Sequence, residues 1–123
     1  MDDWPESWAG DEEDVPIGRQ LAAVMRPFMM DLQREQLSPK TLRRHLNGLW
    51  AIGGETIRRI NYEPLLRTRP PTELLTDAVA DGEAPLLPDL AEAEQAALDA
   101  TARKLHRFLA AQSQAKSPRR KQR

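Results

Sequence analysis

The sequence of 123 residues predicts a small all-α domain of four or five helices. Ala, Leu, Arg and Glu, which favour helices, dominate the chain, whereas the strand-favouring aromatics amount to two Phe and one Tyr, with three Trp. Apolar residues recur at three- and four-residue spacing, which places them on one face of a helix. We expect the domain to span residues 17–111, between an acidic flexible arm over residues 1–16 and a basic flexible tail over residues 112–123.

The first helix is expected within residues 17–36. Its apolar positions follow helical spacing, namely Leu21, Val24, Met25, Phe28, Met29 and Leu32. Pro27 interrupts this pattern, because a proline inside a helix removes a hydrogen bond and costs about 3 kcal/mol. We therefore expect either a kink at Pro27 or two separate helical pieces.

The second helix has the clearest start signal in the chain. Ser38 is a favourable N-cap, and Pro39 occupies the first helical position, where an N–H is not needed. The apolar stripe that we expect to face the core follows at helical spacing: Leu42, Leu46, Leu49 and Trp50. Basic and polar residues occupy the other side of this helix.

A glycine pair, Gly53 and Gly54, follows this stripe. We expect the pair to break or bend the helix, or to permit a close approach between helices. Ile57 and Ile60 continue an apolar face in a following helix, which Pro64 ends.

Two further helices are expected after a linker that contains two adjacent prolines. The shorter one covers residues 72–80, is followed by Gly82, and has an apolar side formed by Leu74, Leu75 and Val79. The longer one runs from about residue 89 to about residue 111, and its apolar side holds Leu90, Ala97, Leu98, Thr101, Leu105, Phe108 and Leu109. The polar and basic chain beyond it is expected to be disordered.

Charge is segregated along the chain, although the net charge is only −1. Residues 1–18 carry seven acids and no base, and residues 70–112 carry a net charge of −5. Residues 19–69 carry ten bases and four acids, and residues 113–123 carry five bases and no acid. This basic middle is compatible with an electropositive face that binds a polyanion.

The polar side of the second helix carries the candidate DNA-binding residues: Lys40, Thr41, Arg43, Arg44 and Asn47. Arginine can bind guanine edges or phosphates with two parallel hydrogen bonds, and asparagine can bind adenine in the same way. The helix N-terminus adds N–H donors for a phosphate. The alternative is an ordinary solvated face, because every amphipathic helix needs one.

The stretch from Phe28 to Leu46 resembles the opening of the N-terminal, SAM-like core-binding domain of tyrosine recombinases and phage integrases. In that family a helix leads into a Leu-Ser-Pro-Lys-Thr turn, which residues 37–41 match, and a second helix follows. His45 stands at the position where the family commonly has Tyr. No recombinase catalytic domain follows in this sequence, so the resemblance implies a stand-alone, DNA-contacting helical fold related to mobile-element proteins, and not recombination.

We expect no enzymatic activity, no cofactor and no metal site. His45 and His106 are the only histidines, lie 61 residues apart and have no paired acids nearby in the sequence. The Gly53-Gly54 pair lacks the Lys-Ser or Lys-Thr that completes a phosphate-binding loop. The chain has no cysteine, which excludes disulfides and thiolate metal ligands.

A protein-interaction module is the alternative to DNA binding. Trp4 and Trp8 lie in the acidic arm, where they either engage a partner or fold back onto the domain, and the last helix offers a second interaction surface. No apolar run approaches the ~20 residues of a membrane helix, and the acidic start of the chain has no signal-peptide core. We therefore expect a cytoplasmic protein that does not enter membranes.

Overall fold

The computed structural model describes residues 3–87 and 89–115, and its helices confirm the predicted all-α class with five α-helices in this part of the chain. The α-helices are α1 (Trp4–Trp8), α2 (Asp14–Arg34), α3 (Pro39–Tyr62), α4 (Pro71–Ala78) and α5 (Glu92–Ala115). Two 3-10 helices, η1 (Pro64–Thr68) and η2 (Ala80–Gly82), flank α4. None of the helices in the described residues is long and apolar enough to cross a membrane.

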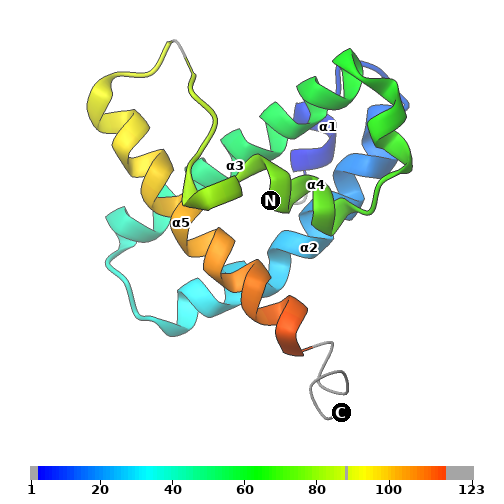
Figure 1. Ribbon diagram of the computed structural model, residues 1–123. Helices are drawn as coiled ribbons and strands as arrows, with labels where there is room; N and C mark the ends of the chain where they lie inside the picture. The colour runs from blue at the N-terminus through cyan, green and yellow to red at the C-terminus, as the bar shows by residue number, and fades with distance from the viewer. Residues whose placement is uncertain (1–2, 88, 116–123) are drawn as a thin grey trace.

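The long helices set the shape of the molecule. Figure 1 shows α2 and α3 running in opposite directions, joined by a short loop, with α5 crossing α3. The residues predicted for the apolar face of α2 line the core between them, except that Val24 is only partly buried. The rings of Phe28 and Phe108 meet there with their centroids 5.4 Å apart. Helix α4 and its C-cap residue add three buried side chains, as predicted: Leu74, Leu75 and Val79.

The buried face of α3 differs from the predicted stripe. Its buried apolar side chains are Leu49, Ile52, Ile57 and Ile60. Leu42 and Leu46 are only partly buried, and Trp50, which we expected in the core, is 45% exposed. Trp50 follows Leu49 directly, so it lies about 100° away around the helix, at the edge of the buried face.

Helix α2 runs without interruption from Asp14 to Arg34 and contains Pro27. The expectation of two helical pieces is wrong, and the helix begins before residue 17. Met25 and Phe28, on either side of the proline, are both buried in one core. Burial of one continuous apolar face therefore offsets the hydrogen bond that the proline removes.

Helix α3 also continues through Gly53 and Gly54, so the expected break is wrong. The alternative expectation, a close approach at the glycine pair, holds at Gly53, where the approaching group is the side chain of Trp8 and not a helix backbone. A Cβ atom at Gly53 would lie 2.2 Å from Cζ2 of Trp8, so the indole occupies the space that a side chain would need. A Cβ atom at Gly54 would lie 3.4 Å from Cδ1 of Trp8, which is an ordinary contact.

The structure differs from the expected flexible arm over residues 3–16. Trp4–Trp8 form α1, and the side chain of Trp8 is only 7% exposed. The Nε1 atom of Trp8 donates a hydrogen bond of 2.9 Å to the carbonyl oxygen of Trp50. The acidic composition did not predict this docking, because the acids Glu6, Asp11 and Glu12 stay exposed while the indole packs inward.

A buried carboxylate fixes the start of α2 to the end of α3. Asp14 is 0% exposed and accepts hydrogen bonds from Arg67 Nη2 at 2.9 Å, from the Gly10 backbone at 2.9 Å and from Asn61 Nδ2 at 3.3 Å. Burial raises the pKa of Asp14, but these hydrogen bonds and the Arg67 charge outweigh burial and hold the pKa below its ordinary value. The network thus joins α2, α3 and η1 through a charged Asp14.

The last helix is shifted relative to the predicted range. Helix α5 spans Glu92–Ala115, whereas we expected residues 89–111. Its apolar side is buried at Leu98, Leu105 and Leu109, as predicted. Residues 116–123, which make up most of the predicted basic tail, lie outside the described residues.

The two glycines of α3 provide a matched pair of variants for the packing of Trp8. We expect Gly53→Ala to lower the free energy of unfolding by about 1–3 kcal/mol, because the new methyl group overlaps the indole. Gly54→Ala has room and should leave stability unchanged or raise it by up to ~1 kcal/mol, because alanine favours the helix. Urea unfolding measures the free energy of unfolding of each variant. Equal stability of the two variants would show that Trp8 does not pack on Gly53.

Candidate nucleic-acid interface

The start of α3 is capped as the sequence predicted. The Oγ atom of Ser38 accepts a hydrogen bond of 3.2 Å from the Thr41 backbone N–H and donates one of 2.9 Å to Thr41 Oγ1. Pro39 is the first helical residue. The side chain of Thr41, one of the predicted site residues, is therefore engaged in the cap and half-buried.

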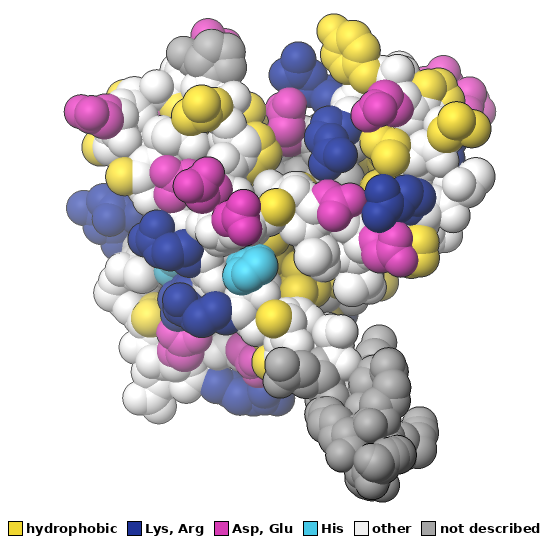
Figure 2. All heavy atoms as spheres, in the orientation of Figure 1, with side chains coloured by type: hydrophobic (Ala, Val, Ile, Leu, Met, Phe, Trp, Pro, Cys, Tyr) yellow, Lys and Arg dark blue, Asp and Glu magenta, His cyan; other side chains and the backbone are white. Residues whose placement is uncertain are grey.

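The other predicted site residues stand exposed on the first two turns of α3. Lys40, Arg43 and Arg44, here called the cationic strip, are exposed, and Asn47 lies next to them. Among the described residues, no acid forms an ion pair with any member of the strip, and the same holds for Arg26, Arg59, Arg103 and Arg107. The bases that are ion-paired are Arg19, Arg34, Arg58, Arg67, Arg69 and Lys104. Figure 2 shows Lys and Arg side chains gathered at the left of the molecule, where the first turns of α3 and the middle of α5 overlap in Figure 1.

A buried histidine holds this part of α3 against α5. The Nδ1 atom of His45 lies 2.7 Å from Oγ1 of Thr101, and both side chains are buried. A Cβ atom at Gly48 would lie only 2.8 Å from the same Oγ1, so the two helices are close at this point. Burial lowers the pKa of His45, and the nearby Lys104 lowers it further, against a smaller opposing effect of Glu35. The neutral imidazole is thus the favoured form behind the strip.

Trp50 completes the exposed face one turn further along α3. Its Nε1 atom donates a hydrogen bond of 2.9 Å to Ser7 Oγ, and its carbonyl oxygen accepts one from Trp8. The docked α1 segment therefore fixes the indole of Trp50 at the surface. We assigned Trp50 to the core from its apolar character, although its position beside Asn47 on the helix indicated the opposite face.

An open groove of about 550 Å³ lies between α3, the start of α5 and the loop before it. Two predicted site residues, Arg44 and Asn47, line this groove together with Trp50. Its other walls are mainly apolar and include Ala51, Leu87, Leu90, Ala97 and Leu98. We call it the Trp50 groove; the sequence did not predict it, because its two sides are about 40 residues apart in the chain.

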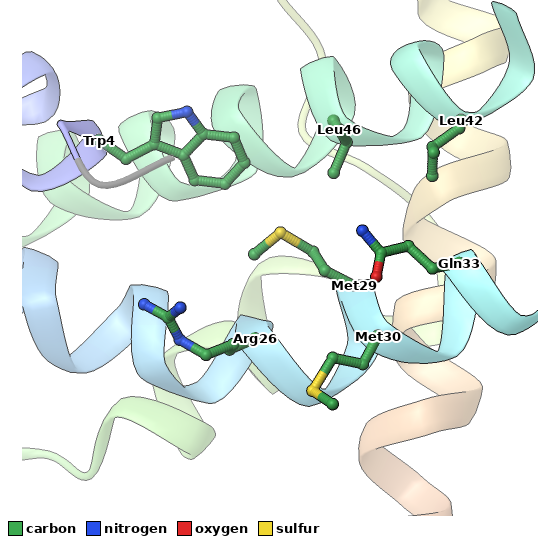
Figure 3. Close-up of a pocket in the computed structure, with 7 residues that line it drawn as sticks. All are labelled: Trp4, Arg26, Met29, Met30, Gln33, Leu42 and Leu46. Carbon is green, nitrogen blue, oxygen red and sulfur yellow. The ribbon is translucent and has the colours of Figure 1, made fainter. Parts of the chain in front are cut away.

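A second open groove, of about 530 Å³, lies between α2 and α3. Figure 3 shows Arg26, Met29, Met30 and Gln33 on the α2 side, Leu42 and Leu46 on the α3 side, and Trp4 at one end. Met30 is 49% exposed and belongs to this surface. We call it the methionine groove, and its chemistry suits apolar side chains of a partner.

The described residues offer little for metal binding. No three His, Cys, Asp or Glu residues among them are grouped so that they could hold a metal ion. His45 bonds to Thr101, and neither His45 nor His106 forms an ion pair with a carboxylate within the described residues. The chemistry of the site is therefore that of cations, one amide and one exposed indole.

Comparisons of the chain with protein-family models, with curated proteins and with solved structures found no match. The resemblance of residues 28–46 to recombinase core-binding domains therefore stays a prediction.

The neutral state of His45 makes a testable contribution to stability. Because the pKa of His45 is lowered in the folded chain, protonation favours the unfolded chain. We expect the free energy of unfolding to fall as the pH drops below about 6.5, the ordinary histidine value, and to level off below the folded pKa. His45→Gln should remove this pH dependence and His106→Gln should keep it, as measured by urea unfolding between neutral and mildly acidic pH. A fall that persists in His45→Gln would assign the effect to another group.

Proposed function

We propose that this protein binds DNA without catalysing a reaction, through Lys40, Arg43, Arg44 and Asn47 on the exposed face of α3. The observation that supports this proposal is the clustering of three exposed cations on the first two turns of one helix, none of which has an ion-pair partner among the described residues. Unpaired, exposed cations can neutralise phosphates and release counterions without first breaking an internal ion pair.

The geometry of a single exposed helix suits duplex recognition. A helix with its side chains is about 10–12 Å across, which matches the ~12 Å width of the major groove. Arg43 and Arg44 would bind phosphates or guanine edges, and Asn47 would bind an adenine edge. The Leu-Ser-Pro-Lys-Thr turn at residues 37–41 supports the same proposal through its resemblance to integrase core-binding domains, of which this chain would be a stand-alone, SAM-like relative.

A protein-interaction role is the second candidate, and the methionine groove favours it. The exposed Met30 and the partly buried Leu42 and Leu46 form apolar walls of this groove, with the buried Met29 between them. Methionine side chains adapt to differently shaped partners, so such a groove can hold the apolar face of a partner helix. This role does not require the cationic strip, and the two candidates therefore make different predictions for variants of Arg43 and Arg44.

The DNA proposal predicts a specific loss on removing two cations. Arg43→Ala combined with Arg44→Ala should weaken binding to a duplex and lower the salt dependence by ~0.9 units of slope for each lost phosphate contact. The matched control is Arg58→Ala combined with Arg69→Ala, which removes two cations that are ion-paired elsewhere on the molecule. Fluorescence anisotropy with a labelled duplex across a salt series measures both. Asn47→Ala should instead change the preference for one base pair by about 1–3 kcal/mol.

The five bases of residues 113–123 need separate treatment, because they carry nonspecific affinity of their own. The same comparison is therefore repeated in a chain that ends at Ala115. If this shorter chain binds equally well with and without Arg43 and Arg44, the strip is not the DNA site. If the full chain shows no measurable affinity for either a duplex or a single strand at physiological salt, the protein-interaction role is favoured.

A further inference from the structure

The Trp50 groove lies directly beside the cationic strip. Arg44 and Asn47 belong to both features, since they are candidate DNA contacts and also line the groove. The groove therefore continues the candidate DNA surface away from the helix and toward α5. A ligand bound on the strip would bring its neighbouring groups to this groove.

The indole of Trp50 forms a fixed aromatic wall. It is 45% exposed, although tryptophan in a small helical protein is usually packed inside. The hydrogen bond of 2.9 Å from Nε1 to Ser7 Oγ restricts the ring, and the one that Trp8 Nε1 donates to the Trp50 carbonyl holds α1, which carries Ser7, against α3. An exposed aromatic ring that is already held in place can stack a planar group with little further loss of freedom.

The other walls suit the flat faces and polar edges of a nucleobase. Ala51, Leu90 and Leu98 supply apolar surface, and the side-chain amide of Asn47 supplies both a donor and an acceptor. Glu94 also lines the groove, but its Oε1 accepts a hydrogen bond of 3.0 Å from the Ala91 N–H at the start of α5. The negative charge thus lies on the α5 side and the free Arg44 on the α3 side, so a phosphate is favoured at α3 and an amino edge toward Glu94.

We propose that the Trp50 groove binds an unpaired base of a single-stranded nucleic acid, stacked on Trp50, while Arg43 and Arg44 hold the adjoining phosphates. This inference builds on the proposed DNA binding and names the class of ligand. Bases in a duplex are stacked on one another and cannot enter a groove, whereas unpaired bases stack readily on exposed aromatic side chains. Single-stranded DNA and RNA share this chemistry.

The experiment compares four labelled probes on the full chain by fluorescence anisotropy at one salt concentration. The probes are a mixed-sequence DNA 12-mer, its duplex, the RNA of the same sequence, and an abasic DNA strand of the same length. We expect the DNA strand to bind roughly tenfold or more tightly than the abasic strand, because only the former can stack. The DNA strand should also bind more tightly than the duplex.

Variants assign the effect to the groove. Trp50→Leu should weaken binding of the DNA strand roughly tenfold and leave the abasic strand within about twofold. Tyr62→Leu is the matched control, because Tyr62 is an 82% exposed aromatic at the far end of the same helix and lies outside the groove. Ala97→Met fills the groove from α5 without touching the hydrogen bonds of Trp50, and it should weaken binding as Trp50→Leu does. A thermal melt of each variant confirms that it is folded.

The outcomes separate this inference from the function on which it rests. If strand and duplex bind equally and Trp50→Leu changes neither, the groove inference is wrong, while DNA binding through the strip stands. If no nucleic acid binds, the proposed function fails as well. Tighter binding of the RNA strand, with the same loss in Trp50→Leu, supports the groove and identifies RNA as the ligand. If light scattering shows a dimer that Trp50→Leu dissociates, a second copy covers the groove and the inference is overturned.

Discussion

Helix α3 depends on two places where a neighbour approaches closer than a side chain would allow. Gly48 admits Thr101 of α5, and Gly53 admits the indole of Trp8. Five residues of an α-helix correspond to a rotation of about 140° beyond one full turn, so the two neighbours press on different sides of α3. The buried face of α3 covers the arc between these two contacts, with Leu49, Ile52 and Ile60, and extends past Gly53 to Ile57. The cationic strip and Trp50 fall on the remaining arc, which is why they face solvent.

Much of the fold follows from local patterns, and the exceptions have one cause. The apolar face of α2 and the Ser38 cap are as predicted, since each depends on residues three or four positions apart. Pro27 was expected to kink a helix or divide it into two pieces, and the glycine pair at residues 53–54 was expected to break or bend one or to permit a close approach. Both lie within helices instead, because contacts with distant parts of the chain stabilise the helical path there. The docking of Trp8 could not be predicted either, since a composition of acids and prolines does not reveal which aromatic finds a partner.

The candidate site also combines features that local spacing predicts with features that depend on distant parts of the chain. That Lys40, Arg43, Arg44 and Asn47 are exposed could be predicted from the spacing of the leucines on the same helix. That the strip has no ion-pair partner among the described residues could not, because pairing depends on which acids the loops and α5 bring near. Thr41 differs from the other candidates through a local interaction, since its hydroxyl accepts a hydrogen bond from the Ser38 cap. The Trp50 groove could not be predicted either, because one of its sides belongs to α3 and the other to α5 and the loop before it.

The N-terminal segment connects the packing of the fold to the shape of the candidate site. Ser7 and Trp8 are neighbours on α1, and they hold Trp50 by its ring and by its backbone. The insertion of Trp8 against Gly53 places Ser7 where it can accept the Trp50 N–H. Docking of α1 and positioning of the aromatic wall therefore depend on contacts of the same short segment. A change that frees α1 would release the indole of Trp50 and leave the cationic strip in place, so it would act on the proposed stacking of a base and not on the proposed phosphate contacts.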